Sequence, residues 1–195
     1  TQLFNLVLLE DGSIVTISNH GAIIKIDKCG KILNYRNDLE YHHSVAKDNN
    51  GNIYAPLVLE NESYFKSLVG YSNKDKFRSE GFAVLDTNLN LKKTYSLKEI
   101  FAKAGLLKDA LDNRKYDSDP FHLNDVDPLL AGKDQNTIVF LSMRHYGIMG
   151  YDLSNENLLW VVKSLSHLQH DVTPLDKSGS SVSVFDNGSE YNTHS

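Results

Sequence analysis

The chain has 195 residues, of which 41% are hydrophobic and 23% are charged, a composition typical of a globular domain with a sizeable core. A net charge of −5 gives no basic surface for nucleic acid. No segment approaches the roughly 18 apolar residues that a membrane-spanning helix needs. With a single cysteine, Cys29, the chain can form neither an internal disulfide nor a zinc site built from cysteines.

A degenerate repeat runs along the chain from its first residues. Each copy begins with a hairpin of two short apolar strands around a turn rich in Asp, Asn and Gly, the residues that tolerate turn backbone. A second hairpin follows, and its first strand ends in Asp. First hairpins are predicted at 6–17, 44–58, 126–141 and 172–185, and second hairpins at 23–35, 82–95 and 148–162.

Four antiparallel strands in a unit of roughly 40–50 residues are typical of β-propeller blades. We therefore predict an all-β propeller, with residues 1–195 as one domain. About four units are visible and the last stops after its first hairpin, whereas propellers carry about 4–8 blades, so the chain is expected to be part of a larger ring. A sandwich would show similar short strands, but it would not need the same pair of hairpins to recur.

Two inserts interrupt the repeat, at about 60–80 and 96–118. The first is polar and aromatic without a clear period, and we predict a long loop there. The second predicts one helix over 97–112, because Ser96 and Glu99 have the spacing of a capping box and apolar residues then mark one face. Long inserts in a compact domain are often functional, and these two are candidates for a lid over one end of the ring.

Three of the eight histidines occupy equivalent places just before the first strand of a unit. His43 and His170 precede a valine of that strand by two residues, and His122 precedes one by four. Offsets of two and four share one face of a strand, so these imidazoles are predicted to meet at one end of the central channel. His42 faces the opposite way, and a slip of one residue would exchange it with His43. The remaining histidines lack this register and are interpreted as structural or surface residues: His20, His145, His167 and His194.

Arg144 follows the second strand of the unit that contains His122, which predicts it at the same end of the channel. A guanidinium is permanently charged, and its planar donors suit sulfate or phosphate oxygens. Imidazole can act as nucleophile, acid or base near neutral pH. A single histidine at the start of a blade would be expected to be structural, but three in register beside an arginine predict an anion site.

Several segments together resemble the arylsulfate sulfotransferases, and the resemblance is best over about 119–188 and weaker over 1–60. The order and spacing of the motifs make it more specific than any one of them. In chain order they are the pair His42-His43 before a strand, His-x-Asn-x-Val within 119–126, Ser-x-Arg within 141–145, an outer strand ending in Trp at Leu158–Trp160, and Gln-His-Asp followed by Asp-Asn-Gly within 168–188.

The resemblance implies a six-bladed bacterial propeller that moves a sulfuryl group from a phenolic sulfate ester to a phenol without a nucleotide, metal or other cofactor. His170 would be the nucleophile that becomes a sulfohistidine. His43, His122 and Arg144 would hold the sulfuryl oxygens, and one histidine would handle the phenol proton. The partners would be an aryl sulfate donor and a phenolic acceptor, in the periplasm or outside the cell. Three further residues would contact the substrate: Asn124, Asn187 and His42.

Two alternatives stay open at this point. A calcium-dependent propeller hydrolase, such as a lactonase, would bind Ca²⁺ through oxygen ligands near the axis, for which the candidates are Asn124, Asp125, Asp171 and Asn187. Asp125 is one residue out of phase with His122 and Asn124, which weakens this reading. In a non-catalytic propeller the histidines would only bind an anion and would never become labelled.

Overall fold

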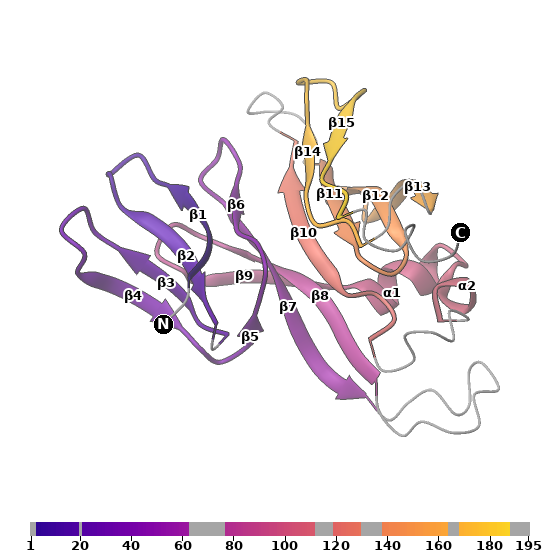
Figure 1. The fold of residues 1–195 in the computed structure, drawn as a ribbon, viewed down its shortest axis with the longest axis horizontal. Helices are drawn as coiled ribbons and strands as arrows, with labels where there is room; N and C mark the ends of the chain where they lie inside the picture. Colours follow the sequence, from indigo (N-terminus) through magenta and orange to yellow (C-terminus); the bar gives the residue numbers. More distant parts are fainter. Residues whose placement is uncertain are drawn as a thin grey trace, which may run out of the picture.

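The computed structural model describes residues 3–19, 21–62, 77–111, 119–129, 138–163 and 168–187. Its sheets are antiparallel, and each sheet is built from strands that are consecutive in the sequence (Figure 1). This is the arrangement of propeller blades that the repeat predicts.

Aspartate side chains stabilise turns in the first blade and in the units that follow it. In the turn after β3, Asp27 Oδ1 accepts hydrogen bonds from the backbone N–H groups of Cys29 and Lys31, both at 2.8 Å. The same contact to two backbone N–H groups recurs at Asp48, Asp86, Asp152 and Asp176. Cys29 is exposed. The strands of this blade are β1 (Leu3–Leu8), β2 (Ile14–Ser18), β3 (Ile23–Ile26) and β4 (Ile32–Arg36).

The inner strand of the second blade is split in two. Its halves, β5 (Glu40–Tyr41) and β6 (Ala46–Lys47), both pair with β7 (Ile53–Glu62). The blade continues outward through β8 (Phe77–Leu85) and β9 (Leu91–Ser96). Strands β7 and β8 therefore extend into the first insert, so that both of its flanks are strand where a loop was expected; its remaining part, 63–76, lies outside the described residues.

The second insert begins as a helix and then turns. Helix α1 (Leu97–Lys103) follows Ser96, whose Oγ accepts the backbone N–H of Glu99 at 3.4 Å, as the capping spacing predicts. Gly105 then has a φ of 71°, a backbone conformation that ends helices and that glycine adopts without strain. The segment predicted as one helix thus forms two, the second being α2 (Leu107–Leu111). None of the helices in the described ranges is both long and apolar enough to cross a membrane.

The third blade is complete, and a single hairpin represents the fourth. The third blade has the order β10-β11-β12-β13, and the fourth unit has β14 paired with β15. These strands are β10 (Leu123–Pro128), β11 (Ile138–Met143), β12 (Gly147–Asp152), β13 (Asn157–Lys163), β14 (Val172–Pro174) and β15 (Val182–Val184).

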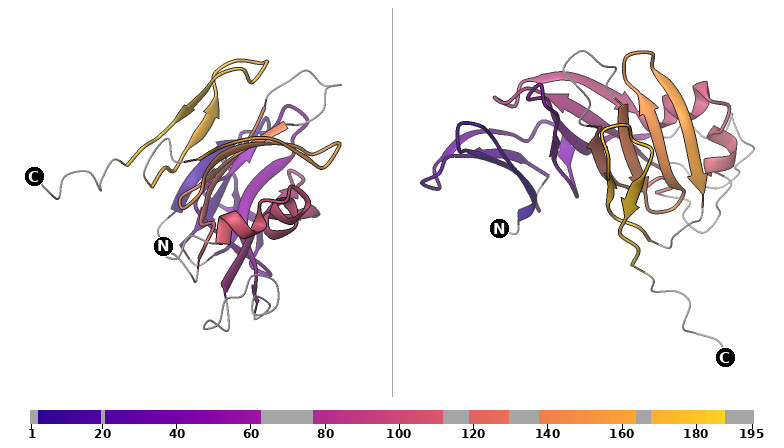
Figure 2. Two further views of the ribbon diagram at one scale, coloured as in Figure 1. Left: turned by 90° about the vertical axis from the view of Figure 1, so that its right-hand side faces the viewer. Right: turned by 90° about the horizontal axis from the view of Figure 1, so that it is seen from above.

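Hydrophobic clusters join each blade to the next. In β8, Phe82 and Val84 pack toward the third blade, whereas Ala83 and Leu85 pack toward the first, because successive side chains of a strand point to opposite faces. A smaller cluster around Val172 joins the third blade to the fourth unit. The inner strands β1, β6, β10 and β14 contact one another in that order, and the blades follow one another round an arc (Figure 2).

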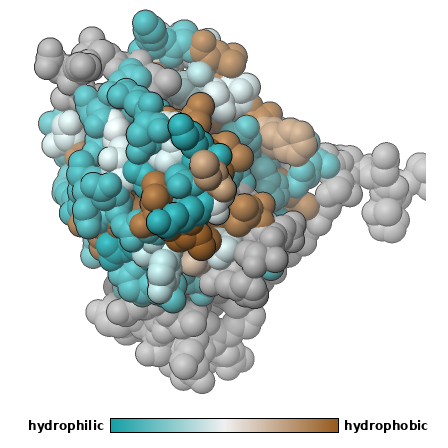
Figure 3. Space-filling view, turned by 90° about the vertical axis from the view of Figure 1, so that its left-hand side faces the viewer, coloured by the Kyte–Doolittle hydropathy of each residue, from teal (hydrophilic) through white to brown (hydrophobic). Residues whose placement is uncertain are grey.

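Exposed hydrophobic side chains gather at the two ends of this arc. Figure 3 views the molecule from the side of the first blade, where hydrophobic residues interrupt a hydrophilic surface. On β1 the exposed residues alternate with Val7 and Leu9, which pack against the second blade. Such surfaces are those on which further blades of a ring would pack. The residues are Leu3, Leu6 and Leu8 on β1, Ile32, Leu33 and Tyr35 on β4, and Leu175 and Phe185 in the fourth unit.

Candidate active site

Histidines from three consecutive blades meet where the inner strands begin. His43 lies in the break between β5 and β6, His122 lies directly before β10, and His170 lies two residues before β14. The ring centroid of His43 is 5.2 Å from that of His122 and 5.9 Å from that of His170. The structure therefore brings together the three histidines singled out by their place in the repeat.

Two of these three histidines do not have the extended strand backbone that the sequence predicted. His43 and His122 have φ angles of 60° and 49°, so neither belongs to an extended strand and the shared-face reasoning does not apply to them. Left-handed backbone is uncommon for residues with a side chain, although histidine adopts it more readily than most. Strained backbone of this kind concentrates at functional sites. Each of these two imidazoles therefore leaves the chain at a bend before a strand.

Burial distinguishes the adjacent pair His42 and His43. His42 exposes only 9% of its surface, whereas His43 is more exposed and contacts the other rings. Their Nδ1 atoms are 2.7 Å apart, so one of these nitrogens donates a hydrogen to the other. Burial, reinforced by neighbouring imidazoles, lowers the pKa of His42 to about 2 and that of His43 to about 4. Both rings are therefore neutral at pH 7, and the hydrogen bond with the buried ring of His42 fixes the orientation of His43.

A buried carboxyl group lies behind His42. Glu80 Oε1 is 3.5 Å from His42 Nε2 and 3.1 Å from Arg78 Nε, and Glu80 Oε2 accepts the backbone N–H of Leu123. Burial, followed by repulsion from Asp119, raises the pKa of Glu80 to about 8. Sequence reasoning missed Arg78 and Glu80 because both lie in the insert interpreted as a loop. Extending the alternation of β8 toward its start would have found them.

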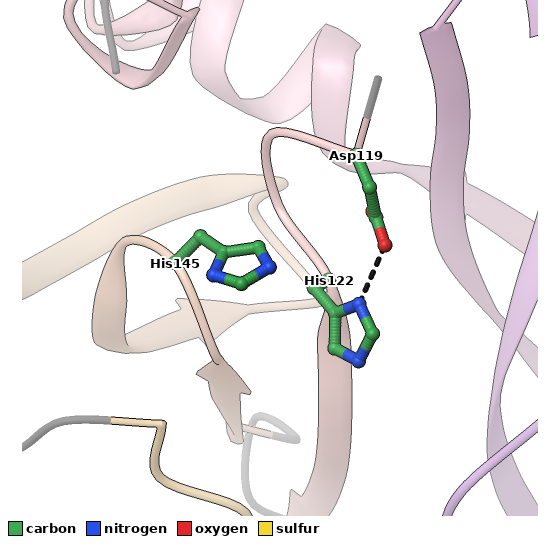
Figure 4. A group of neighbouring side chains, drawn as sticks. All are labelled: Asp119, His122 and His145. Carbon is green, nitrogen blue, oxygen red and sulfur yellow. Dashed lines mark hydrogen bonds and ion pairs between the residues drawn. The ribbon is translucent and has the colours of Figure 1, made fainter. Parts of the chain in front are cut away.

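His122 has a carboxylate partner and a second imidazole beside it. Asp119 Oδ2 lies 2.5 Å from His122 Nδ1 (Figure 4). The ring of His145, interpreted from sequence as structural or exposed, lies 5.2 Å from that of His122. One ligand atom from each of these three residues lies within 4.8 Å of the others, which makes them the candidate metal ligands of the described part of the chain. His145 was missed because it lies in a turn, outside the register.

Arg144 and His170 complete the site. The backbone N–H of Arg144 donates to the carbonyl of His122 at 2.9 Å, and Arg144 Nε is buried without a hydrogen-bond partner among the described residues. The guanidinium group as a whole is suited to binding an anionic oxygen. The backbone N–H of His170 donates to Phe185 O at 3.0 Å. Burial, followed by the charge of Arg144, lowers the pKa of His170, which favours the neutral form that carries a lone pair.

The two asparagines expected to contact substrate have different surroundings. Asn124 is buried, and its Nδ2 donates to Gln169 O at 2.5 Å. Gln169 Nε2 in turn donates to Met143 O at 2.6 Å. These bonds hold the residue before His170 against the third blade, so Asn124 positions the backbone next to the candidate nucleophile. Asn187 is exposed, three residues after β15, and its contact with substrate stays a prediction.

The acids of the calcium alternative lie further along the inner strands. Asp125 and Asp171 line a cavity of about 380 Å³ together with Lys47 and Asp127, an acid that was not among the predicted calcium ligands. Asp125 Oδ2 accepts the backbone N–H of Val172 at 3.1 Å, so this carboxyl joins two blades. Burial raises the pKa of Asp125 to about 7 and that of Asp127 to about 6. Because Asp125 and Asn124 both make contacts between blades, the calcium alternative finds little support here.

A model of the arylsulfotransferase (ASST) family matches residues 2–166. The chain belongs to the arylsulfotransferase family. The matched range includes His43, His122 and Arg144 and ends before His170. The family match thus covers three of the four proposed site residues, and their roles stay predictions.

Solved structures similar to this arylsulfotransferase chain confirm the propeller prediction. The β-propeller domain of Cps50 (Swd1) from Myceliophteria thermophila gives a TM-score of 0.54 at 11% identity, covering 94% of this chain and 48% of that one. The Dos1 propeller gives a TM-score of 0.50 at 10% identity, covering 89% and 38%. The chain therefore spans half or less of these propellers, and the likeness shows the fold alone. Comparison with curated proteins gave no match.

Proposed function

We propose that the protein is an aryl sulfotransferase that moves a sulfuryl group from a phenolic sulfate ester to a phenol, with His170 as the nucleophile. The observation that carries this proposal is the meeting of three histidines beside Arg144 in a chain of the arylsulfotransferase family. Residues 1–195 would form one propeller domain within a larger ring. The family resemblance further implies that the whole protein works in the periplasm or outside the cell.

The reaction would proceed in two displacements, because each is easier than direct transfer between two bound phenols. A ring nitrogen of His170 attacks sulfur, the N–S bond forms, and the ester S–O bond breaks with its electron pair leaving on the phenolate. The acceptor phenol then gives its proton to a histidine of the site, and its oxygen attacks the same sulfur. The N–S bond breaks and its electron pair returns to His170.

The surrounding groups suit the charges that develop during this transfer. Negative charge grows on the sulfuryl and leaving oxygens, and preorganised donors stabilise it best where water is excluded. Arg144 would supply the permanent positive charge beside His170. The ring of His43 lies beside those of His122 and His170, and it would hold a further sulfuryl oxygen.

The test uses the full-length protein with 4-nitrophenyl sulfate and a phenol acceptor, without added metal or nucleotide. We expect release of 4-nitrophenol, and mass spectrometry after donor alone should find about 80 Da added to His170, the mass of an SO₃ group held covalently. His170→Ala should abolish both signals. Arg144→Ala should slow turnover roughly 10²–10³-fold, as expected for losing one charge-stabilising donor.

Arg36→Ala is the matched control, because Arg36 pairs with Asp38 on the first blade, and its activity should equal that of the wild type. Activity that a chelator abolishes would favour the calcium hydrolase. Failure to release phenol from any aryl sulfate, with sulfate still bound, would favour an anion-binding propeller.

A further inference from the structure

His122 differs from the other rings of the site because a carboxylate touches it directly. Asp119 Oδ2 is 2.5 Å from His122 Nδ1, and the two side chains expose 22% and 18% of their surface. Figure 4 shows the carboxylate directed at this nitrogen. By contrast, the partner of His43 Nδ1 is another imidazole, that of His42. Of these two contacts, only the one between Asp119 and His122 places a negative charge against an imidazole. The ring of His122 lies next to that of His43.

The contact determines which nitrogen of His122 carries hydrogen. Burial is the largest single effect and acts to raise the pKa of Asp119, but the hydrogen bond from His122 and the positive charges nearby together outweigh it, so the pKa lies below its usual value. Asp119 is therefore an ionised acceptor at pH 7, and His122 Nδ1 must be the donor. A neutral His122 then has its lone pair on Nε2, on the far side of the ring from Asp119.

We propose that Asp119 is a positioning residue that makes His122 the acid–base group of the sulfuryl transfer, with Nε2 exchanging the phenol proton. This inference rests on the proposed function. When the acceptor attacks, His122 Nε2 takes the phenol proton as the O–S bond forms and the N–S bond to His170 breaks. The imidazolium lies against Asp119 until the next donor binds. It then gives the same proton to the departing phenolate, so that the proton balance closes over one cycle.

The same three side chains of Figure 4 have the composition of a metal site, but their surroundings disfavour a divalent cation. The guanidinium of Arg78 acts on Asp119 and helps to lower its pKa. This permanent positive charge repels a divalent ion near the cluster. Metal binding is therefore an outcome that the test must be able to detect.

The other titratable groups near this pair come from every element around it. They are His42 and His43 from the split inner strand, Glu80 from β8, His145 from the β11–β12 turn and His170 from the start of the fourth unit. A pH profile alone would mix their contributions. The experiment therefore separates the two half-reactions.

In the full-length protein, Asp119→Asn keeps the size of the side chain and removes its charge. Release of 4-nitrophenolate in the first turnover should be unchanged within about twofold, because this leaving group is acidic enough to depart without a proton. Transfer from sulfated His170 to phenol should slow roughly 10²–10⁴-fold, the usual contribution of general base catalysis. The loss should be smaller for more acidic phenols, and Asp119→Glu should restore part of the rate. Asp38→Asn, which removes an exposed carboxylate on the first blade, should change neither step.

A variant that slows both half-reactions equally would overturn the proposal, because Asp119 would then only shape the site. Nitrogen NMR of His122 tests the contact without activity: the wild type should carry hydrogen on Nδ1, and a wild-type ring protonated only on Nε2 would overturn the proposal. If the wild-type protein never becomes labelled on His170, the proposed function fails while this NMR result still stands. Stoichiometric Co²⁺ binding that is needed for activity and is lost in Asp119→Asn would overturn the proposal in favour of a metal site.

Discussion

At the scale of single residues, buried neutral imidazoles make the stability of the protein depend on pH. The pKa of His42 falls from an ordinary value of 6.5 to about 2 on folding. Below pH 6.5 the unfolded chain therefore binds a proton that the folded protein does not. The contribution of His42 to the free energy of unfolding therefore decreases as pH falls from 6.5, by about 1.4 kcal/mol per pH unit for one fully shifted group.

His42→Gln should remove this contribution. We expect the variant to lose less stability than the wild type between pH 6.5 and about 4.5, as measured by urea unfolding at a series of pH values. Glu80, whose raised pKa acts in the opposite direction, is present in both proteins. Parallel curves for the two proteins would show that His42 is not held neutral in the folded state.

Sequence reasoning at this scale succeeded where a residue type recurred at one place in the repeat. His43, His122 and His170 could be found in this way, although two of them reach the cluster through left-handed backbone that the pattern does not reveal. Asp119 and His145 occupy irregular chain around the strands. Their approach to His122 follows from folding in three dimensions, for which the sequence offers no period.

At the scale of elements, the aspartate turns are the feature that local chemistry specifies best. A carboxylate that accepts two backbone N–H groups fixes the turn without help from distant residues, which is why the hairpins could be predicted. The inserts have no such local rule. Strands β7 and β8 continue into the first insert through pairing with each other, and Gly105 divides the second.

The turn at Asp86 allows a direct test of this role. Its Oδ1 accepts the backbone N–H groups of Asn88 and Asn90 at 2.8 and 2.9 Å. Asp86→Ala should lower the free energy of unfolding by about 1–3 kcal/mol, the usual effect of losing such hydrogen bonds. Asp86→Asn keeps one acceptor oxygen and should cost less than half as much. Equal losses in thermal or urea unfolding would mean that charge, rather than acceptor geometry, stabilises the hairpin.

At the scale of the whole molecule, the hydrophobic clusters between blades differ in size. Those on either side of the second blade contain most of the buried residues, whereas the cluster that holds the β14–β15 hairpin is small. Elements with few buried contacts open at lower cost than the rest of a protein. The hairpin that carries the candidate nucleophile is therefore the least firmly attached part of the described arc.

Trp160, the single tryptophan, packs against this small cluster, with its ring 5.7 Å from that of Phe140. Its fluorescence should therefore change at a lower urea concentration than the far-UV circular dichroism. Val172→Ala, which removes a fully buried side chain of the same cluster, should lower the fluorescence midpoint by the equivalent of about 2 kcal/mol and leave the dichroism midpoint nearly unchanged. Coincident transitions in both proteins would show that the four units unfold together.

The exposed thiol of Cys29 has a practical consequence for the study of the arc. It is the single cysteine, and it lies in a turn of the first blade, while the single tryptophan lies on the outer strand of the third. Within residues 1–195, a thiol-reactive acceptor dye attached there would form a resonance energy transfer pair with Trp160. The efficiency of that transfer would report whether the angle between blades changes when an aryl sulfate enters or leaves the site.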